Sequence, residues 1–414
     1  MKKILWFCNR VFSEKNNNGG SWLQPLAEEL NNNGVNIINV SFGNIKEIES
    51  YSFNGIKQWI IPKKKQKGYG QLSVKSTLEE IKYIFSVENP DLVHIWGTES
   101  VWASIIYNNL ISRNKILLDI QGLLFSIEKF YYGGLSFSEV VKCINLKEIL
   151  LPNRMLFFKK YIFHKRGIIE KNILKNYENI STQSEWVRAH IKQVSPTSKL
   201  YNTNIILRKK FYTSPQWIYK KTEYPTIFSI CAAAVSYKGA HILLKAVSIL
   251  KEKYPNIKVR LAGNIIIGNR LKDGYSLYLL HLIKKLNLTD NIIFLGNINE
   301  DNIINELYNC NVCVIPSFVE TYCLAFAESM AVGVPTVVSF AGAMPELAVN
   351  MKEAIFYSPL DYNNAAYYIQ ELIENKELAE FISKNARKRR LEENNIDKVV
   401  KNQLNIYNEI LSNV

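Results

Sequence analysis

Two glutamates, Glu320 and Glu328, are separated by seven residues in the stretch 317–335. The run before them, 311–316, is apolar and predicts a buried strand, whereas 325–332 predicts a helix. The first N–H groups of a helix have no partner within it, so a helix that starts after a strand favours a bound phosphate. Carboxylates accept hydrogen bonds from sugar hydroxyls: Glu328 would hold a ribose and Glu320 a second sugar. This order of groups predicts a site for a nucleotide-sugar.

Three further residues are expected at the same edge of the second half's sheet. Lys238, in a Lys-Gly pair, follows one predicted strand and could meet a diphosphate. Asn297 follows another strand end, and Gly342 lies in a turn rich in small residues. Ligands of parallel sheets bind at the carboxyl ends of the strands. We therefore expect these residues at the strand ends where the donor would bind.

The first half of the chain offers weaker candidates at its own strand ends. A Gly-Gly pair follows the first predicted strand, where glycine lets the backbone approach a phosphate or sugar. Gly20 of this pair is assigned to the donor. The residues expected on the acceptor side or along the cleft are Gly19, Gln121, Trp96, Glu99 and Arg208.

Short apolar runs alternate with longer helical patterns along the whole chain, which is typical of parallel sheets covered by helices. The predicted class is α/β with two sheets. We expect a first domain at 1–205, a linker at 206–224, a second domain at 225–396, and a last helix at 397–414 that returns to the first domain. The predicted strands lie near 3–7, 35–40, 56–61, 91–96, 116–120, 179–182 and 200–201, and near 226–231, 258–262, 292–295, 312–315, 336–338 and 354–357.

The segment around Glu320 and Glu328 resembles the donor site of glycosyltransferase family 4 (glycosyl transferases group 1), and smaller motifs extend the resemblance along most of the chain. The family implies a GT-B fold, with two Rossmann-like parallel-sheet domains facing across a cleft, and transfer with retention. It also implies that Lys238 stabilises the departing diphosphate. The backbone that would contact phosphate or sugar belongs to Tyr322, Cys323 and Leu324.

The sequence departs from the family pattern at three places. Gly-Phe-Gly is usual after the first glutamate, but Thr-Tyr-Cys stands at 321–323. The family's arginine five residues before Lys238 is Ala233 here, and we hypothesise that Arg208 or Lys209 supplies the charge. Gln121 replaces a histidine, so the leaving phosphate is expected to accept the acceptor's proton.

Cysteine usage and the absence of metal motifs limit the class of protein. The six cysteines are scattered, and Cys310 and Cys313, although spaced C-x-x-C, would point to opposite sides of a strand. This predicts packing in a reducing, cytoplasmic compartment. No His-Glu-x-x-His, Asp-x-Asp or P-loop pattern occurs, so neither a metal nor a cofactor is expected. No apolar run is long enough to span a membrane.

Lysine and arginine number 51 against 37 acidic residues, a net charge of +14. Two clusters, at 61–67 and 154–166, combine basic with apolar side chains, the second with several aromatic rings. A basic helix with aromatic residues can lie on an anionic membrane, which predicts peripheral contact at the inner face of the plasma membrane. The alternative is a core helix with lysines extended over apolar surface. Nucleic acid is not expected, because no recognised module accompanies the charge.

We expect a retaining hexosyltransferase, independent of metal, that moves a sugar from a nucleoside-diphosphate donor to a hydroxyl of a glycan or lipid-linked acceptor. UDP is favoured slightly over GDP, and bacterial surface polysaccharide synthesis is the expected setting. Two alternatives stay open. One is a non-catalytic GT-B protein that binds nucleotide-sugar or polysaccharide, and the other is an epimerase or phosphorylase on the same fold. The product formed would separate them.

Overall fold

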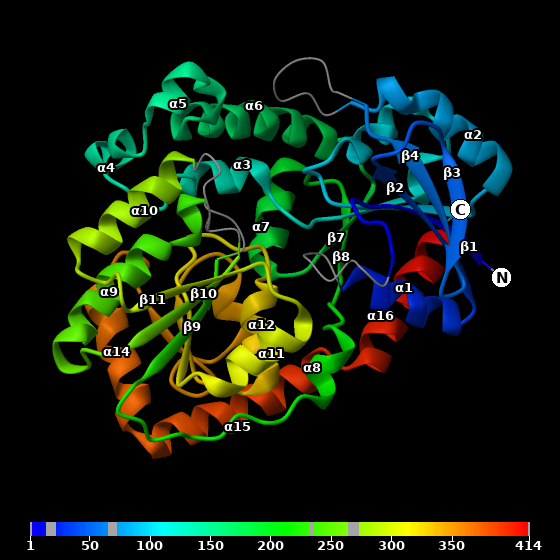
Figure 1. Ribbon diagram of the computed structural model, residues 1–414. Coiled ribbons are helices and arrows are strands. Elements are labelled where there is room, and N and C mark those ends of the chain that lie inside the picture. The colour runs from blue at the N-terminus through cyan, green and yellow to red at the C-terminus, as the bar shows by residue number, and fades with distance from the viewer. Residues whose placement is uncertain (1, 14–21, 65–72, 232–234, 264–272, 413–414) are drawn as a thin grey trace. The chain divides into compact units, whose positions relative to one another are not determined.

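The computed structural model describes residues 2–13, 22–64, 73–231, 235–263 and 273–412. The contacts of the chain divide it into two units. Unit 1 comprises Met1–Glu128, Ile162–Arg208 and Asn394–Val414, and unit 2 comprises Lys129–Tyr161 and Lys209–Glu393. Each unit is built on one sheet with helices around it (Figure 1). The predicted α/β class with two sheets is confirmed.

Unit 1 contains an eight-stranded sheet in the order β3-β4-β2-β1-β5-β6-β7-β8. All neighbours pair in parallel except β3 with β4. β1, β2, β4, β5 and β6 are mostly buried apolar runs, as in a sheet covered on both faces. Their bounds are β1 Lys2–Phe7, β2 Val35–Gly43, β3 Glu49–Phe53, β4 Ile56–Pro62, β5 Leu92–Trp96, β6 Ile116–Asp119, β7 Asn179–Thr182 and β8 Lys199–Asn202.

The longer helices of unit 1 include one from the end of the chain. They are α1 Leu23–Asn32, α2 Leu78–Glu88, the greater part of α6 Leu156–Leu174, α7 Glu185–Val194 and α16 Ile396–Ser412. In α16 the buried Tyr407 hydroxyl accepts a hydrogen bond from Trp6 Nε1 at 3.0 Å and lies 2.7 Å from His94 Nδ1. Tryptophan only donates, so the tyrosine proton goes to the histidine, which is neutral and accepts at Nδ1. These bonds fasten α16 to β1 and β5.

Unit 2 contains a six-stranded parallel sheet in the order β11-β10-β9-β12-β13-β14. The helix α9 packs against α10 and α14, and α12 packs against α8, α11 and α15. The strands are β9 Thr226–Ile230, β10 Lys258–Ala262, β11 Ile292–Gly296, β12 Val312–Ile315, β13 Thr336–Ser339 and β14 Ile355–Tyr357. The helices are α8 Lys209–Thr213, α9 Ala240–Lys253, α10 Gly274–Lys285, α11 Glu300–Asn309, α12 Leu324–Val332, α13 Met344–Leu347, α14 Tyr362–Glu374 and α15 Lys376–Glu393.

Two segments of unit 2 differ from the predicted domain boundaries. Residues 129–161 lie between β6 and β7 in sequence, yet their contacts group them with unit 2. They carry α4 Phe137–Lys142 and α5 Leu146–Leu150. Residues 209–224, predicted as a linker, pack against unit 2: the buried Trp217 donates from Nε1 to Cys310 O at 2.8 Å and from its backbone N–H to Val332 O at 2.9 Å.

Candidate functional site

Lys238 and Glu320, both predicted for the donor site, are bonded to each other in unit 2. Lys238 Nζ donates to Glu320 Oε1 at 2.6 Å, and the two side chains are 23% and 14% exposed. Burial acts to lower the pKa of the Lys238 ammonium, but the charge and the hydrogen bond of Glu320, with smaller contributions from Cys323 and Tyr237, together outweigh it and raise that pKa above its usual range. The lysine therefore stays charged at any physiological pH, and it sits where a phosphate could compete with Glu320 for it.

The turn that carries Lys238 is held against the strand end that precedes Glu320. Gly239 has φ +72°, and a Cβ there would lie 1.9 Å from the carbonyl oxygen of Pro316. The backbone N–H of Phe318 donates to Tyr237 O at 2.8 Å. Glycine is needed at 239 both for the left-handed conformation and for the close approach. The turn consequently places the start of α9 beside the loop that leads to α12.

The loop from Glu320 to the start of α12 keeps a glycine-like backbone although the family's glycines are absent. Cys323 is the N-cap of α12 with φ +86° and ψ 76°. Beneath the loop, Gly342 has φ +55°, and a Cβ there would lie 2.3 Å from Glu320 O. The Ala343 N–H donates to the same oxygen at 2.9 Å. The predicted Gly342 thus supports the backbone of Glu320.

The helices α9 and α12 both begin without a side-chain cap, after Gly239 and Cys323 respectively. Uncapped first-turn N–H groups and the helix dipole favour an anion at a helix start. Because Lys238 and Glu320 precede these two starts and bond to each other, the starts lie at one edge of the sheet. Two helix starts and one ammonium form a suitable environment for a diphosphate.

Glu328 lies inside α12 and is 5% exposed. Burial raises the pKa of the Cys323 thiol well above its usual range, and the charge of Glu328 is among the smaller causes in the same direction, which places that carboxylate near the start of the helix. Tyr322 Oη accepts a hydrogen bond from Arg390 Nη1 at 3.2 Å. Arg390, on α15, is buried and also donates to Leu347 O at 2.6 Å.

The remaining donor candidates have different outcomes. Leu324, half-buried, opens α12, and Asn297 is exposed directly after β11. Gly19, Gly20 and Ala233 lie outside the described residues. Arg390 was missed by sequence reasoning, since nothing in the pattern of α15 connects it to a loop far earlier in the chain.

In unit 1, the predicted Trp96 and Gln121 both lie at the ends of their strands. Trp96 is 2% exposed and packs edge-on against Trp6 and Trp22, which differs from its predicted place along a cleft. Gln121 is half-buried, and its Nε2 donates to Asp119 Oδ1 at 2.7 Å. The predicted Arg208 is buried and is the last residue of the middle segment of unit 1.

Glu99 belongs to a group of acidic side chains at the same strand ends. Burial raises the pKa of its carboxyl to about 7, and the nearby carboxylates of Glu170 and Asp119 add to the rise. Glu170, on α6, is also buried with a pKa of about 7, and it accepts hydrogen bonds from Thr98 Oγ1 and, at 3.0 Å, from the N–H of Phe125. Two neighbouring carboxyls therefore titrate near neutral pH. The sequence indicated Glu99 alone, because α6 brings Glu170 from far along the chain.

Comparison with known proteins identifies the part of the chain that carries the Lys238–Glu320 pair. Residues 215–389, all within unit 2, match the family described as "Glycosyl transferases group 1". This part of the chain is therefore similar to group 1 glycosyltransferases, and we call residues 215–389 the group 1 domain. The uncharacterized glycosyltransferase YqgM of Bacillus subtilis is 32% identical over 180 residues, 43% of this chain and 48% of that protein. The chain thus aligns with less than half the length of such a curated relative.

Solved structures resemble the whole chain at low sequence identity. Sucrose-phosphate synthase from Thermosynechococcus elongatus superposes with a TM-score of 0.73 at 17% identity and covers all of both chains. Alr3699/HepE from Anabaena, solved in complex with UDP and glucose, has a TM-score of 0.69 at 15% identity, again over the full length of both. With the two parallel sheets, this likeness confirms the predicted GT-B fold.

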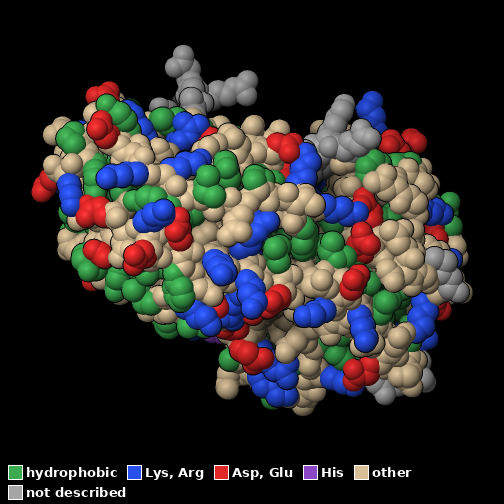
Figure 2. Space-filling model, turned by 90° about the horizontal axis from the view of Figure 1, so that it is seen from below, with side chains coloured by type: hydrophobic (Ala, Val, Ile, Leu, Met, Phe, Trp, Pro, Cys, Tyr) green, Lys and Arg blue, Asp and Glu red, His purple; other side chains and the backbone are tan. Residues whose placement is uncertain are grey.

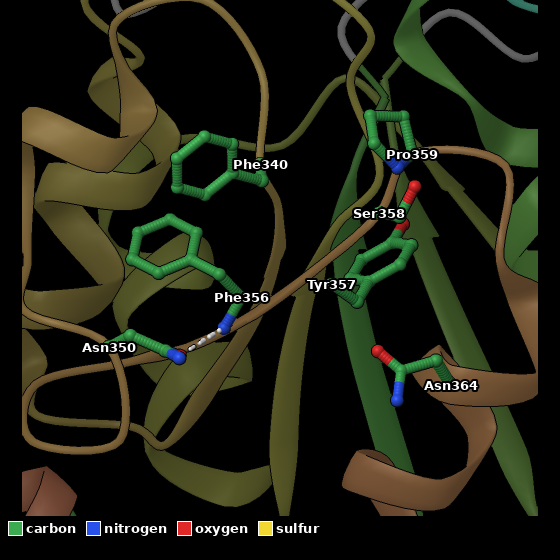
Figure 3. Close-up of a pocket in the computed structure, with 7 residues that line it drawn as sticks. All are labelled: Phe340, Asn350, Phe356, Tyr357, Ser358, Pro359 and Asn364. Atoms are coloured by element: carbon green, nitrogen blue, oxygen red, sulfur yellow. Dashed lines mark hydrogen bonds between the residues drawn. The ribbon is translucent and has the colours of Figure 1, made fainter.

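The group 1 domain also contains a pocket of about 450 Å³ at the carboxyl ends of β13 and β14 (Figure 3). The rings of Phe340 and Phe356 pack edge-on along one side, 5.9 Å apart, and Asn350 Oδ1 accepts from the Phe356 N–H at 2.9 Å. None of the residues predicted from the sequence lines it. Its lining consists of Phe340, Asn350, Phe356, Tyr357, Ser358, Pro359 and Asn364.

On the face drawn in Figure 2, Lys and Arg side chains are interspersed with Asp and Glu. In the part of the chain that the structure describes, no helix is both long and apolar enough to cross a membrane. All six cysteines are buried and free, as expected for packing.

Proposed function

We propose that this protein is a retaining glycosyltransferase of family 4 that moves a hexose from a nucleoside-diphosphate sugar to a hydroxyl of a glycan or lipid-linked acceptor. The observation that carries the proposal is the Lys238–Glu320 pair, held at 2.6 Å between the uncapped starts of α9 and α12 in a group 1 domain. The diphosphate of a donor needs the ammonium and the helix N–H groups, and its sugar and ribose need carboxylates that accept hydrogen bonds from hydroxyls.

Each donor-side residue has a proposed task. Lys238 stabilises the charge that develops on the leaving diphosphate. Glu320, which holds the ammonium in the structure, exchanges it for the hydroxyls of the transferred sugar when the diphosphate binds. The backbone at 322–324 contacts phosphate or sugar, and Glu328 accepts hydrogen bonds from the ribose. Gly342 keeps the Glu320 backbone in place.

The proton of the acceptor hydroxyl goes to the leaving phosphate. Gln121 has no basic nitrogen, and its amide donates to Asp119, so it is not a general base. Glu99, whose carboxyl has a pKa near 7, is the one acceptor-side candidate that could take the proton instead. Loss of all turnover in Glu99→Gln, with donor binding unchanged, would favour that second route.

We propose a UDP-sugar as donor, ahead of a GDP-sugar, in line with the UDP found in the Anabaena structure. No metal is assigned to the reaction, so turnover is expected to be insensitive to chelators. The proposed setting is the synthesis of a bacterial surface polysaccharide in the cytoplasm, at the inner face of the plasma membrane.

A second candidate function is binding of nucleotide-sugar without transfer. It is motivated by the absence of the family's residues at Ala233, Thr321 and Cys323. The backbone of Cys323 supports the transferase instead, because its positive φ preserves the loop conformation that glycine would give.

The test measures binding and diphosphate release over a panel of UDP-, GDP- and ADP-sugars, with and without EDTA. Lys238→Ala is expected to keep binding within about tenfold and to lose release by at least about a hundredfold, because it removes one charge from the transition state. Glu328→Ala is expected to lose binding. Matched controls are Lys352→Ala and Glu377→Ala, both exposed in the same unit. Binding without release in the wild type would favour the second candidate, and no binding to any donor would contradict both.

A further inference from the structure

The segment 129–161 exposes an unusual number of large apolar side chains. Phe137, Leu146 and Leu150 are 76%, 81% and 80% exposed. Ile149 is more than half exposed, and Val141 and Leu151 more than two fifths. Single exposed apolar residues are ordinary, but a group within one short segment marks a surface that binds something. We call these six residues the α4–α5 surface.

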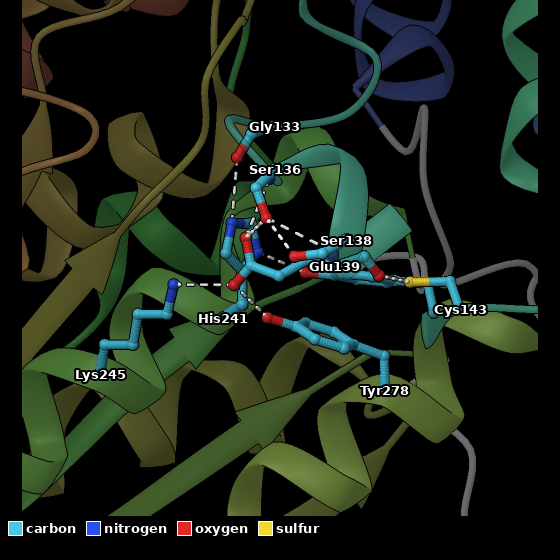
Figure 4. Close-up of polar contacts among 9 residues, drawn as sticks. Gly133, Ser136, Ser138, Glu139, Cys143, His241, Lys245 and Tyr278 are labelled. Atoms are coloured by element: carbon cyan, nitrogen blue, oxygen red, sulfur yellow. Dashed lines mark hydrogen bonds and ion pairs between the residues drawn. The ribbon is translucent and has the colours of Figure 1, made fainter. Parts of the chain in front are cut away.

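The α4–α5 surface stands on a backbone that is firmly attached to the group 1 domain (Figure 4). His241, in α9, lies with Nε2 2.9 Å from the carbonyl oxygen of Gly133, and Ser236 Oγ donates to Tyr131 O at 2.5 Å. The Gly274 N–H, at the start of α10, donates to Glu148 Oε1 at 2.7 Å. The segment that exposes these apolar side chains is therefore anchored to α9, to the turn before α9 and to the start of α10.

The acidic and the basic side chains of the segment differ in exposure. Its acidic residues are Glu139 and Glu148. Glu139 Oε1 accepts from Lys245 Nζ at 3.1 Å and from Tyr278 Oη at 2.7 Å, and Glu148 is 2% exposed. Glu139 thus faces α9 and α10 (Figure 4), and Glu148 faces the start of α10. The exposed charged side chains of the segment are basic: Lys129, Lys142 and Arg154.

We propose that the α4–α5 surface docks the protein on an anionic lipid bilayer. Leucine, isoleucine and phenylalanine side chains enter the interface between headgroups and acyl chains, and the exposed basic side chains of the same segment attract anionic headgroups. Charge complementarity favours lipid over a protein partner, because the segment exposes cations and apolar groups, whereas its two carboxylates are paired or buried and offer a protein interface little polar complement.

This surface is connected to the donor site through α9. The segment's Gly133 is packed so closely on the turn before Lys238 that a Cβ there would lie 2.2 Å from Ser236 O. The same helix that begins after Lys238-Gly239 carries His241 and Lys245, which hold the segment. Docking on the membrane brings the donor site to a lipid-linked acceptor, and in this respect the inference rests on the proposed function. Its test, however, measures vesicle binding and needs no turnover.

The experiment is sedimentation of the full-length protein with vesicles of phosphatidylcholine alone or with roughly a third phosphatidylglycerol. The wild type is expected to bind the anionic vesicles and much less the neutral ones. The double variant Leu146→Ser/Leu150→Ser is expected to lower the partition coefficient at least about tenfold, because two leucines no longer enter the interface. The matched control is Ile249→Ser/Phe381→Ser, which removes exposed apolar side chains from α9 and α15.

Wild-type protein that stays in solution with anionic vesicles, or a double variant that binds as well as the wild type, would overturn the proposal. A self-associating wild type whose dimer is lost in the double variant, with no vesicle binding, would assign the surface to a second copy and also overturn it. Donor binding and diphosphate release without vesicles are expected to be equal in wild type and double variant. Their absence in both would contradict the proposed function and leave the vesicle result to be judged on its own.

Discussion

At the scale of single residues, the donor loop depends on backbone geometry more than on glycine itself. Cys323 has φ +86° where the family resemblance expects glycine. A side chain in this left-handed region costs roughly 1–2 kcal/mol. The conformation is kept because Cys323 is buried and because Gly342 and the Ala343 N–H fix the neighbouring Glu320 carbonyl. The chain thus carries local strain where a phosphate is proposed to bind, as functional loops often do.

Cys323→Gly is expected to be more stable than Cys323→Ala by about 1 kcal/mol, because alanine keeps the strain and glycine removes it. Chemical denaturation followed through unit 2 measures the difference. At Ala331, within α12, glycine is expected to be less stable than alanine by about 1 kcal/mol, which is the ordinary order in a helix. If the glycine variant were less stable than the alanine variant at position 323 as well, the residue would not be strained.

The carboxyl of Glu99 predicts a pH dependence of the stability of unit 1. Its pKa in the folded protein is about 7, above the ordinary 4.5, so the folded state holds the proton more tightly than the unfolded state. The stability that this tighter proton binding gives to the folded state is fully present below pH about 4.5 and is lost as the pH rises through about 7. Glu99→Gln, which imitates the protonated acid, is expected to stabilise unit 1 at pH 8 by roughly 1–3 kcal/mol and to change little at pH 5.

Urea denaturation at the two pH values tests this prediction. The control is Glu79→Gln, since Glu79 is an exposed residue on α2 paired with Lys82. Equal stability of Glu99→Gln and wild type at pH 8 would mean that the Glu99 carboxyl is ionised without penalty.

At the scale of elements, the start of α9 depends on one close contact. A Cβ at Gly239 would lie 1.9 Å from Pro316 O, and the φ of +72° is also unfavourable for other residues. Gly239→Ala is expected to destabilise unit 2 by more than about 2 kcal/mol and to lower diphosphate release, because Lys238 moves away from Glu320. Gly34→Ala is the matched control: its φ is +84°, but nothing lies within 4 Å of the added Cβ. Gly34→Ala has the unfavourable φ without a close contact, which costs roughly 1 kcal/mol. Equal losses of stability in the two variants would therefore exclude the contact with Pro316 O as the cause.

The elements also show which features a sequence can reveal. Buried parallel strands are short apolar runs between turns, so β6 and β12 are predictable from local pattern. The antiparallel edge strand β3 is largely exposed and polar, and it was not predicted. Lys238 and Glu320 could both be assigned to the donor site in advance because both follow strands of one parallel sheet, whereas their bond to each other is known from the structure. The partners of Glu99 and Tyr322 come from α6 and α15, and no local pattern announces such contacts.

The same limit explains the assignment of residues 129–161. Their position between two strands of the first sheet predicts that they belong to it, whereas Glu139 and Glu148 bond to α9 and α10. A carboxylate that will be paired with a lysine far along the chain has the same appearance in sequence as a solvated one. Because these two glutamates are paired or buried, the exposed charged side chains of the segment are basic, and this is the basis of the proposed membrane contact.

At the scale of the whole molecule, the last helix completes unit 1 although the group 1 domain precedes it in the chain. The Tyr407 hydroxyl is bonded to Trp6 Nε1 and His94 Nδ1, and all three side chains are buried. Removing the hydroxyl leaves a donor and an acceptor without a partner. Tyr407→Phe is therefore expected to destabilise unit 1 by roughly 1–3 kcal/mol, with the affinity of unit 2 for nucleotide-sugar unchanged.

Calorimetric unfolding with and without UDP-sugar separates the two units, because a ligand stabilises only the unit that binds it. In Tyr407→Phe the transition that the ligand does not shift is expected to move to lower temperature, and the ligand-sensitive transition to stay in place. Tyr367→Phe, an exposed tyrosine on α14, is the control and is expected to move neither. If the ligand-sensitive transition moved with Tyr407→Phe, the two units would unfold together, and the donor site would depend on α16 as well as on its own sheet.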